Sequence, residues 1–126
     1  MIETIIYNYM TQNLGVAAYM EKPQALPTVS TSNPTPYRFV VIEKTGGNES
    51  NFINRAVIAI QCYAESLYQA AALAELVNAK MENLPSLATV ASCRLNNSYN
   101  FTDTNAKQYR YQSVFEVWWY TEENNG

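Results

Sequence analysis

The side chains that could do chemistry are few, and their spacing assembles no catalytic pair. The sequence of 126 residues contains no histidine, which removes the commonest general base and the usual partner of a serine or cysteine nucleophile. The remaining acid–base candidates lie in different predicted elements without paired spacing: Glu43, Glu49, Glu65 and Asp103. We therefore predict no catalytic residues and expect the protein not to be an enzyme.

The cysteines and glycines also point to structure rather than chemistry. Cys62 and Cys93 lie far apart and form no CxxC pair, so they supply neither a disulfide framework nor a set of zinc ligands, and we expect them to be reduced and buried. Gly46-Gly47 lacks the Gly-Lys-Ser/Thr ending of a phosphate loop, and we interpret it as a turn between two strands, where glycine permits a positive φ. The sequence predicts no cofactor and no metal.

The composition describes one folded domain, residues 1–126, with a sparsely charged surface. Hydrophobic residues make up 48% of the chain and charged residues only 15%, against about 25% in a typical domain. Much of the surface must then be neutral, apolar or covered by a partner. A net charge of -3, with only eight lysines and arginines, argues against nucleic-acid binding, which needs clustered cations.

The same composition gives no sign of a membrane protein. No apolar run approaches the roughly 20 residues of a membrane span. The start of the chain, Met1-Ile2-Glu3-Thr4, does not look like a signal peptide. We expect a soluble, cytosolic product without a membrane partner.

Apolar periodicity predicts two helices. Apolar residues recur at helical spacing from Ile2 to Met10, and Gly15 follows as a stop. Ser66, with Gln69 three residues later, predicts a cap for a second helix over roughly 67–84. The apolar stripe predicted for the second helix consists of Leu67, Ala70, Ala71, Ala74, Val77, Met81 and Leu84.

Two pairs of strands complete the expected fold. Residues 37–44 and 53–64 are β-branched and aromatic and are predicted to form a hairpin through the glycine turn. Residues 88–95 and 107–120 are predicted to pair across the Asn-rich loop 96–106. The order helix, hairpin, helix, hairpin predicts an α+β fold with a mainly antiparallel, four-stranded sheet and helices packed on it.

Strand alternation predicts one core face and one face that needs a cover. The predicted core face comprises Ala56, Ile58, Ile60 and Cys62 from the first hairpin, and Tyr109, Tyr111, Ser113, Phe115, Val117 and Trp119 from the second. Trp118, Tyr120, Val114, Val57 and Tyr63 would lie on the side away from the second helix. Either the first helix or another subunit must cover that side, and the sequence leaves both alternatives open.

Two segments stand apart from these elements. Residues 21–36 hold four of the chain's five prolines, and we interpret them as an extended arm or loop that could contact a partner. Residues 121–126 are polar and are expected to be a frayed tail.

Several stretches along nearly the full chain share a familiar pattern: the N-terminal helix, the segment Pro36-Tyr37-Arg38-Phe39-Val40-Val41-Ile42, the Gly46-Gly47 turn, residues 57–66 leading into an alanine-rich helix, and residues 109–119 as a closing strand. Together they resemble the tail terminator proteins of long-tailed bacteriophages, also called tail-completion or tail-to-head joining proteins. None of these stretches is a catalytic signature.

The resemblance implies a structural virion protein that forms a hexameric ring, caps the tail tube and joins the tail to the head or neck. Its partners would be further copies of itself, the tail-tube protein and a neck or head-connector protein, while DNA would only pass through the lumen. Its location would be the tail or neck region of the virion, after assembly in the host bacterial cytoplasm. The alternatives are another tube, neck or head-completion subunit, or a small-molecule binding domain with a pocket between helix and sheet.

Contact residues are predicted by element. The predicted interface residues are Gly46, Gly47, Asn48 and Glu49 in the hairpin turn, Tyr99, Phe101 and Asp103 in the Asn-rich loop, and Trp118 and Tyr120 in the last strand. For Trp118 and Tyr120, burial under the first helix is the alternative. A further hypothesis places Glu43, Glu49 and Asp103 on an acidic lumen, since like charge would let DNA pass without sticking.

Overall fold

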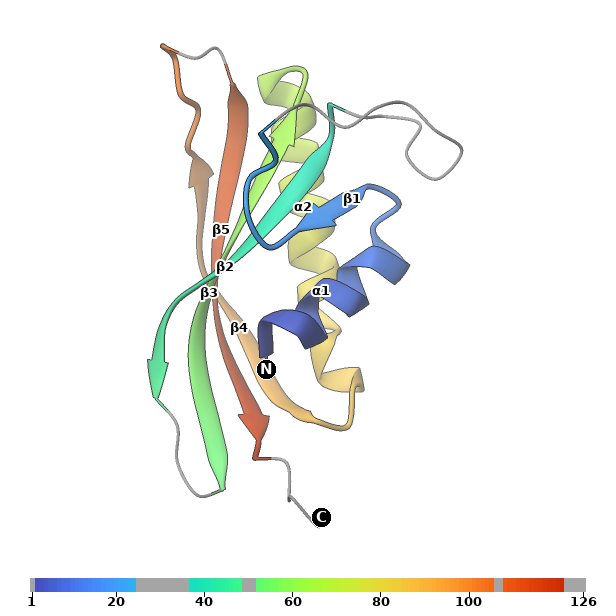
Figure 1. Ribbon diagram of the computed structural model, residues 1–126, viewed down its shortest axis with the longest axis vertical. Coiled ribbons are helices and arrows are strands. Elements are labelled where there is room, and N and C mark those ends of the chain that lie inside the picture. The colour runs from blue at the N-terminus through green and yellow to red at the C-terminus, as the bar shows by residue number, and fades with distance from the viewer. Residues whose placement is uncertain (1, 25–36, 49–51, 106–107, 122–126) are drawn as a thin grey trace.

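A five-stranded sheet with both helices on one face forms the protein, as seen in the computed structural model (Figure 1). The structure describes residues 2–24, 37–48, 52–105 and 108–121. The elements are α1 (Ile2–Asn13), β1 (Ala17–Tyr19), β2 (Phe39–Asn48), β3 (Ile53–Ala64), α2 (Leu67–Glu82), the 3-10 turn η1 (Leu84–Ser86), β4 (Val90–Asn100) and β5 (Tyr109–Tyr120). The α+β class predicted from the sequence is confirmed.

The sheet is mixed rather than purely antiparallel. Its strand order is β1-β2-β3-β5-β4, and β1 pairs with β2 in parallel while the other neighbours are antiparallel. The predicted four-stranded sheet was wrong because β1 has only three residues, too few for strand alternation to show. In the β1–β2 pair, Ala17 lies opposite Phe39 and Tyr19 lies opposite Val41.

The second hairpin is longer than predicted. Residues 96–100 belong to β4 rather than to a loop, and they pair with β5 up to Asn100 opposite Tyr111. Asparagine is generally depleted in β-strands. Here the pairing with β5, a long and largely apolar strand, outweighs that tendency. The connection between the strands is therefore shorter than the predicted 96–106.

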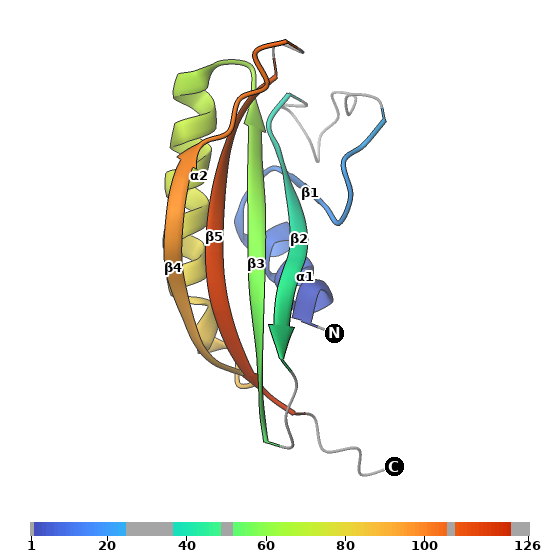
Figure 2. The ribbon, with the colours of Figure 1, turned by 90° about the vertical axis from the view of Figure 1, so that its left-hand side faces the viewer.

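Both helices cover the same face of the sheet. Figure 2 shows α1 and α2 together behind the strands. Their buried side chains, Ile2, Ile6 and Met10 from α1 and Leu73, Val77 and Met81 from α2, belong to one core cluster with Ile58, Ile60 and Phe115 of the sheet. Of the two covers that the sequence left open for the opposite face, the first helix is thereby excluded.

The predicted core face is largely confirmed. Ala56, Ile58, Ile60 and Cys62 are buried, as are Ser113, Phe115, Val117 and Trp119. Tyr109 was predicted in the same set, but it is 40% exposed because it is the first residue of β5, at the end of the sheet.

The second helix begins as the sequence predicts. The Ser66 side chain accepts a hydrogen bond from the Gln69 backbone N–H at 3.1 Å, which satisfies one of the free donors of the first turn. The apolar stripe was wrong at Leu67, which is 40% exposed, while Leu73 is buried instead. Leu73 lies three residues from Ala70 and four from Val77 and thus shares their face.

The two glycines predicted as a turn are part of β2. Gly46 pairs with Val57 and Gly47 with Ala56, after a register shift between Lys44 and Gly46. The φ of Gly47 is +148°, and a Cβ there would lie 2.2 Å from the Arg55 carbonyl oxygen. Glycine is thus required by the close approach of β3, and the hairpin connection falls after Asn48, largely outside the described residues.

The strands on either side of the central β3–β5 ladder, β2 and β4, are irregular, whereas the ladder itself is not. Register shifts occur in β2 at Lys44/Gly46 and in β4 at Val90/Ser92 and Leu95/Asn97. The β3–β5 ladder runs without a shift from Ile53 opposite Tyr120 to Ala64 opposite Tyr109. The regular ladder forms the middle of the sheet, and β-bulges are confined to the strands on either side.

The glycine geometry yields a matched pair of substitutions. We expect Gly47→Ala to lower the free energy of unfolding by about 1–3 kcal/mol, because the backbone conformation is strained for alanine and the new methyl group meets β3. Gly46→Ala, which meets no atom within 4 Å, is the control and should leave stability nearly unchanged. Urea unfolding of both variants checks this, and equal losses would contradict a position-specific requirement at Gly47.

Candidate oligomerisation surface

The face of the sheet opposite the helices carries no helix of the described residues (Figure 2). Its β2 side is nevertheless buried, where Phe39, Val41 and Tyr63 form a small cluster with Ala17 and Tyr19, so the accessible part lies toward β5 and β4. The centre of the face is formed by outward residues of β3 and β5, which face one another in register. These pairs are Arg55 with Trp118, Val57 with Glu116, Ala59 with Val114, Gln61 with Gln112, and Tyr63 with Arg110. We call this set, with Arg94 and Tyr99 of β4, the open face.

A charge network lies at one end of the open face. The Glu116 carboxylate forms two ion pairs. Its Oε2 lies 3.0 Å from Arg55 Nε, and its Oε1 lies 2.9 Å from Arg94 Nη2. Asn96 Nδ2 donates to the same Oε1 at 3.0 Å, and the Arg94 guanidinium lies 5.9 Å from the Trp118 ring. The Asn96 hydrogen bond, followed by the two guanidiniums, lowers the pKa of the Glu116 carboxyl to about 2.

A ladder of amides and phenols crosses the middle of the same face. Tyr63 donates to Gln61 Oε1 at 3.2 Å, and Gln61 Nε2 donates to Gln112 Oε1 at 3.1 Å. Gln112 in turn donates to the Tyr99 hydroxyl, and Arg110 Nη1 donates to Tyr63 at 2.9 Å. These polar groups satisfy one another across three strands, so this part of the face needs no cover to complete its hydrogen bonds.

An aromatic cluster lies at the end of the open face away from the charge network. Phe39 stacks on Tyr63 at 4.7 Å, and Tyr19 meets Phe39 edge to face at 5.7 Å. Arg110 connects this cluster to the β4–β5 connection, because its guanidinium lies 4.5 Å from the Phe101 ring and its Nε donates to the Phe101 carbonyl at 2.6 Å. The connection is thereby fixed to the sheet.

The structure places the described interface residues at the two ends of the sheet, with Trp118 and Tyr120 at the same end as Asn48, because Asn48 and Trp118 both pair with Arg55. Gly46, Gly47 and Asn48 lie at one end of the sheet, whereas Tyr99, Phe101 and Asp103 lie at the opposite end, where β4 turns to β5 (Figure 1). Asp103 forms an isolated bridge with Gln108. Trp118 is half-buried on the open face and Tyr120 is 53% exposed, while Glu49 lies outside the described residues. Their contact role stays a prediction.

The four candidate carboxylates are not brought together. Glu65 forms an ion pair with Arg38, with Nη2 and Oε1 2.5 Å apart, and this partner lowers its pKa. Glu43 is exposed on β2 and Asp103 lies at the β4–β5 end. The described residues contain no cluster of three or more His, Cys, Asp or Glu side chains that could hold a metal. The acidic lumen stays a hypothesis.

The remaining predictions concern the two cysteines, the proline-rich arm and the C-terminal tail. Both cysteines are free, Cys62 buried and Cys93 half-buried. Burial raises the pKa of Cys62, and it raises that of Cys93 to about 12, so both thiols stay protonated at neutral pH. Most of the predicted arm, residues 25–36, and residues 122–126 of the tail lie outside the described residues. No helix of the described ranges is long and apolar enough to cross a membrane.

Strand alternation alone does not predict the charge network around Glu116. Alternation placed Arg55 on the outward side of β3 and Glu116 on the outward side of β5, which was correct. Their diagonal contact, and the addition of Arg94 and Asn96, depend on the register between β3, β5 and β4. A register of this kind has no signal in a single sequence beyond the shared polar face.

Comparison with known proteins gives a likeness of fold. No family model and no curated protein matches the sequence. Among solved structures, the chain is similar to one described as "Virion of native gene transfer agent (GTA) particle", with a TM-score of 0.51, 10% identity and coverage of 95% of both chains. The likeness spans nearly the whole of both chains, and at this identity it shows a shared fold.

The charge network generates a pH prediction. Since the folded-state pKa of Glu116 is depressed to about 2, below the ordinary value of about 4.3, its contribution to stability is present above pH 4.3 and is lost as the pH falls toward 2. We expect Glu116→Gln to lower stability at pH 7 and to reduce the fall in stability between pH 5 and pH 2.

The measurement is urea unfolding of both proteins across that pH range. Glu43→Gln, which removes an exposed carboxylate from β2, serves as the matched control and should keep the wild-type slope. An unchanged slope in Glu116→Gln would show that other carboxylates cause the acid sensitivity.

Proposed function

We propose that this protein is a structural subunit of a phage-like virion, and that it acts as a tail terminator whose ring caps the tail tube and meets the neck or head connector. The observation that carries the proposal is the fold shared with a chain of a gene transfer agent virion over 95% of both chains. The sequence resemblance to tail terminators, on which the finer role rests, points in the same direction.

The open face supports assembly rather than catalysis. One side of the sheet is covered by both helices. The other side, the open face, presents half-buried Trp118 and Val114 beside paired charges. Interfaces between subunits combine aromatic side chains and arginine in this way. A sheet that is apolar on one side and mixed on the other fits a subunit whose second side faces other copies.

The two ends of the sheet differ chemically, which supports a subunit placed between unlike partners. One end carries Phe101 at 39% exposure and is fixed by Arg110. The other carries the exposed Gly46, Gly47 and Asn48. A terminator needs such a difference, because it meets tube subunits on one side and a connector on the other.

One observation favours a different class of function. A groove of about 280 Å³ lies between α2 and β4, which is the place where a small-molecule binding domain would hold its ligand. Its volume lies just below the range of about 300–1,000 Å³ that is typical of ligand pockets. Its mouth is formed by exposed Glu82 and Leu95, and we therefore prefer the virion role to the ligand-binding alternative.

The test is assembly with tail-tube subunits of the same particle. We expect light scattering to show rings of this protein, alone or on tube ends, and electron microscopy to show that tubes stop growing when it is added. Open-ended polymers of this protein by itself would indicate a tube subunit. A monomer that does not affect tube growth would overturn the virion role and favour the ligand-binding alternative.

A further inference from the structure

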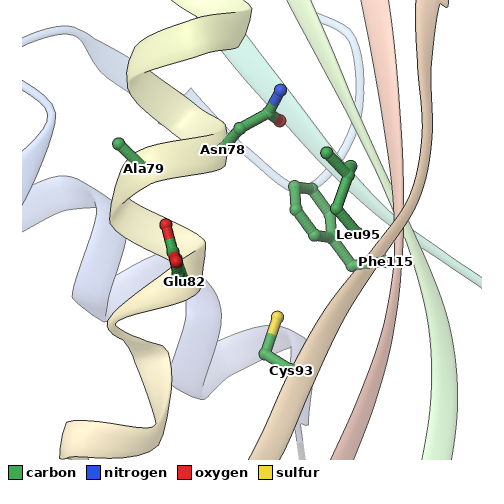
Figure 3. A pocket seen from close by; sticks show the side chains of 6 residues that line it. All are labelled: Asn78, Ala79, Glu82, Cys93, Leu95 and Phe115. Carbon is green, nitrogen blue, oxygen red and sulfur yellow. The ribbon is translucent and has the colours of Figure 1, made fainter.

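A groove between α2 and β4 has an apolar floor and polar walls. It is lined by Asn78, Ala79 and Glu82 of α2, Cys93 and Leu95 of β4, and Phe115 of β5. Figure 3 shows Asn78 of α2 directed toward the Phe115 ring and Leu95, with Cys93 below them and Glu82 on the side of α2 nearer the viewer. Leu95 is 44% exposed although it packs beside a fully buried phenylalanine, so apolar surface is left accessible here.

The wall on α2 offers hydrogen-bond acceptors. The Oδ1 atom of Asn78 is buried without a hydrogen-bond partner among the described residues. The Glu82 carboxylate stands at the mouth, and Glu75 lies two turns earlier on the exposed side of α2. Neither carboxylate has an ion-pair partner in the described part of the chain. An apolar floor with acceptors on its wall suits a side chain that has an apolar stem and a cationic head.

The outer surface of α2 extends this site with further apolar groups. Tyr68 is 78% exposed and Leu76 is 39% exposed, and Ala72 and Ala79 are exposed between them. Two carboxylates flank this helix surface, and the one cation of α2, Lys80 in its last turn, is half-buried. We call Glu75, Glu82 and the groove the acceptor side of the molecule.

The open face carries the complementary groups. Three of the chain's four arginines, Arg55, Arg94 and Arg110, lie on it. Glu116 is shared by Arg55 and Arg94, so this network keeps one unit of positive charge. The Arg94 side chain is 67% exposed and lies near the Trp118 ring, which gives a cation with an aromatic surface beside it.

We propose that two copies of this chain associate head to tail, with Arg94 and Trp118 of one copy docked on the acceptor side of the next, at Glu82 and the groove. This inference rests on the proposed function and specifies which faces join the subunits. Charge complementarity selects a second copy as the occupant, because the open face of the chain carries the arginines and the acceptor side carries carboxylates that have no ion-pair partner among the described residues. Within one chain Arg94 is paired with Glu116 instead.

The charges exclude one kind of two-fold contact, in which acceptor side meets acceptor side or open face meets open face, because like charges would then come together. A two-fold contact that pairs Arg94 with Glu82 in both directions keeps the charges opposite, so the mass of the assembly decides between the two symmetries, and a closed dimer would overturn the head-to-tail contact. A contact between two different surfaces is heterologous, and it closes into a ring when the rotation between subunits permits. The inference therefore agrees with ring assembly without requiring strand addition.

Charge reversal provides the test. We expect Glu82→Arg and Arg94→Glu each to weaken self-association at least about tenfold at low ionic strength, because each places like charges across the contact. An equimolar mixture of the two variants should associate again, since every contact in an alternating assembly then pairs opposite charges. A chain carrying both changes should associate as the wild type does.

Light scattering and sedimentation at high protein concentration measure these states, with thermal unfolding as a check on folding. Glu21→Arg and Lys44→Glu change the net charge by the same amounts at exposed positions away from the contact, and both controls should associate normally. If the Arg94 variant unfolds more easily, Trp118→Ala serves in its place and should also weaken association.

The outcomes separate this inference from the proposed function. Wild-type protein that assembles on tubes but is insensitive to both reversals, or that stays monomeric without tubes, keeps the terminator role and overturns the head-to-tail contact. Reversals that weaken association without rescue in the mixture also overturn it. Protein that neither self-associates nor affects tubes contradicts both.

Discussion

The packing of α1 and α2 against the same side of the β3–β5 ladder is the constraint on which the rest of the structure depends. Ile58 and Phe115 lie at the centre of this contact and are almost fully buried. The described residues form two helices and one 3-10 turn besides the strands. Both helices pack on this side, so no described helix is left to cover the other side. The fold is therefore two layers thick, and what its open face does follows from its side chains alone.

The polar side chains of the open face form hydrogen bonds and ion pairs with one another. Glu116 joins three strands through Arg55, Arg94 and Asn96, and the Gln61–Gln112 pair joins β3 to β5. Such cross-strand pairs stabilise the sheet in water. They also leave a surface that is ordered before any partner arrives, so that binding costs little side-chain entropy. The half-buried Trp118, beside Arg94 at the end of the charge network, is suited to a contact between subunits.

The sequence predicted those features that depend on local periodicity. The Ser66 cap, the buried residues of β3 and most of those of β5 follow from repeats of 3.6 and 2 residues, and they were confirmed. The features that were wrong depend on distant parts of the chain. β1 exists because β2 offers it an edge, residues 96–100 are a strand because β5 lies beside them, and Gly47 is fixed by the β3 backbone. The charge network belongs to the same group, since it requires the β3–β5–β4 register.

The β-bulges in β4 and in the part of β2 that extends beyond its pairing with β1 have a consequence for how copies can meet. A regular edge would let a neighbouring chain continue the sheet by main-chain hydrogen bonds, and this would lead to fibres. The irregular backbone at Lys44/Gly46 on one side and at Val90/Ser92 and Leu95/Asn97 on the other interrupts such a template. Recognition between copies is thereby transferred from the backbone, which is the same in every protein, to side chains on the faces, which can distinguish one partner from another.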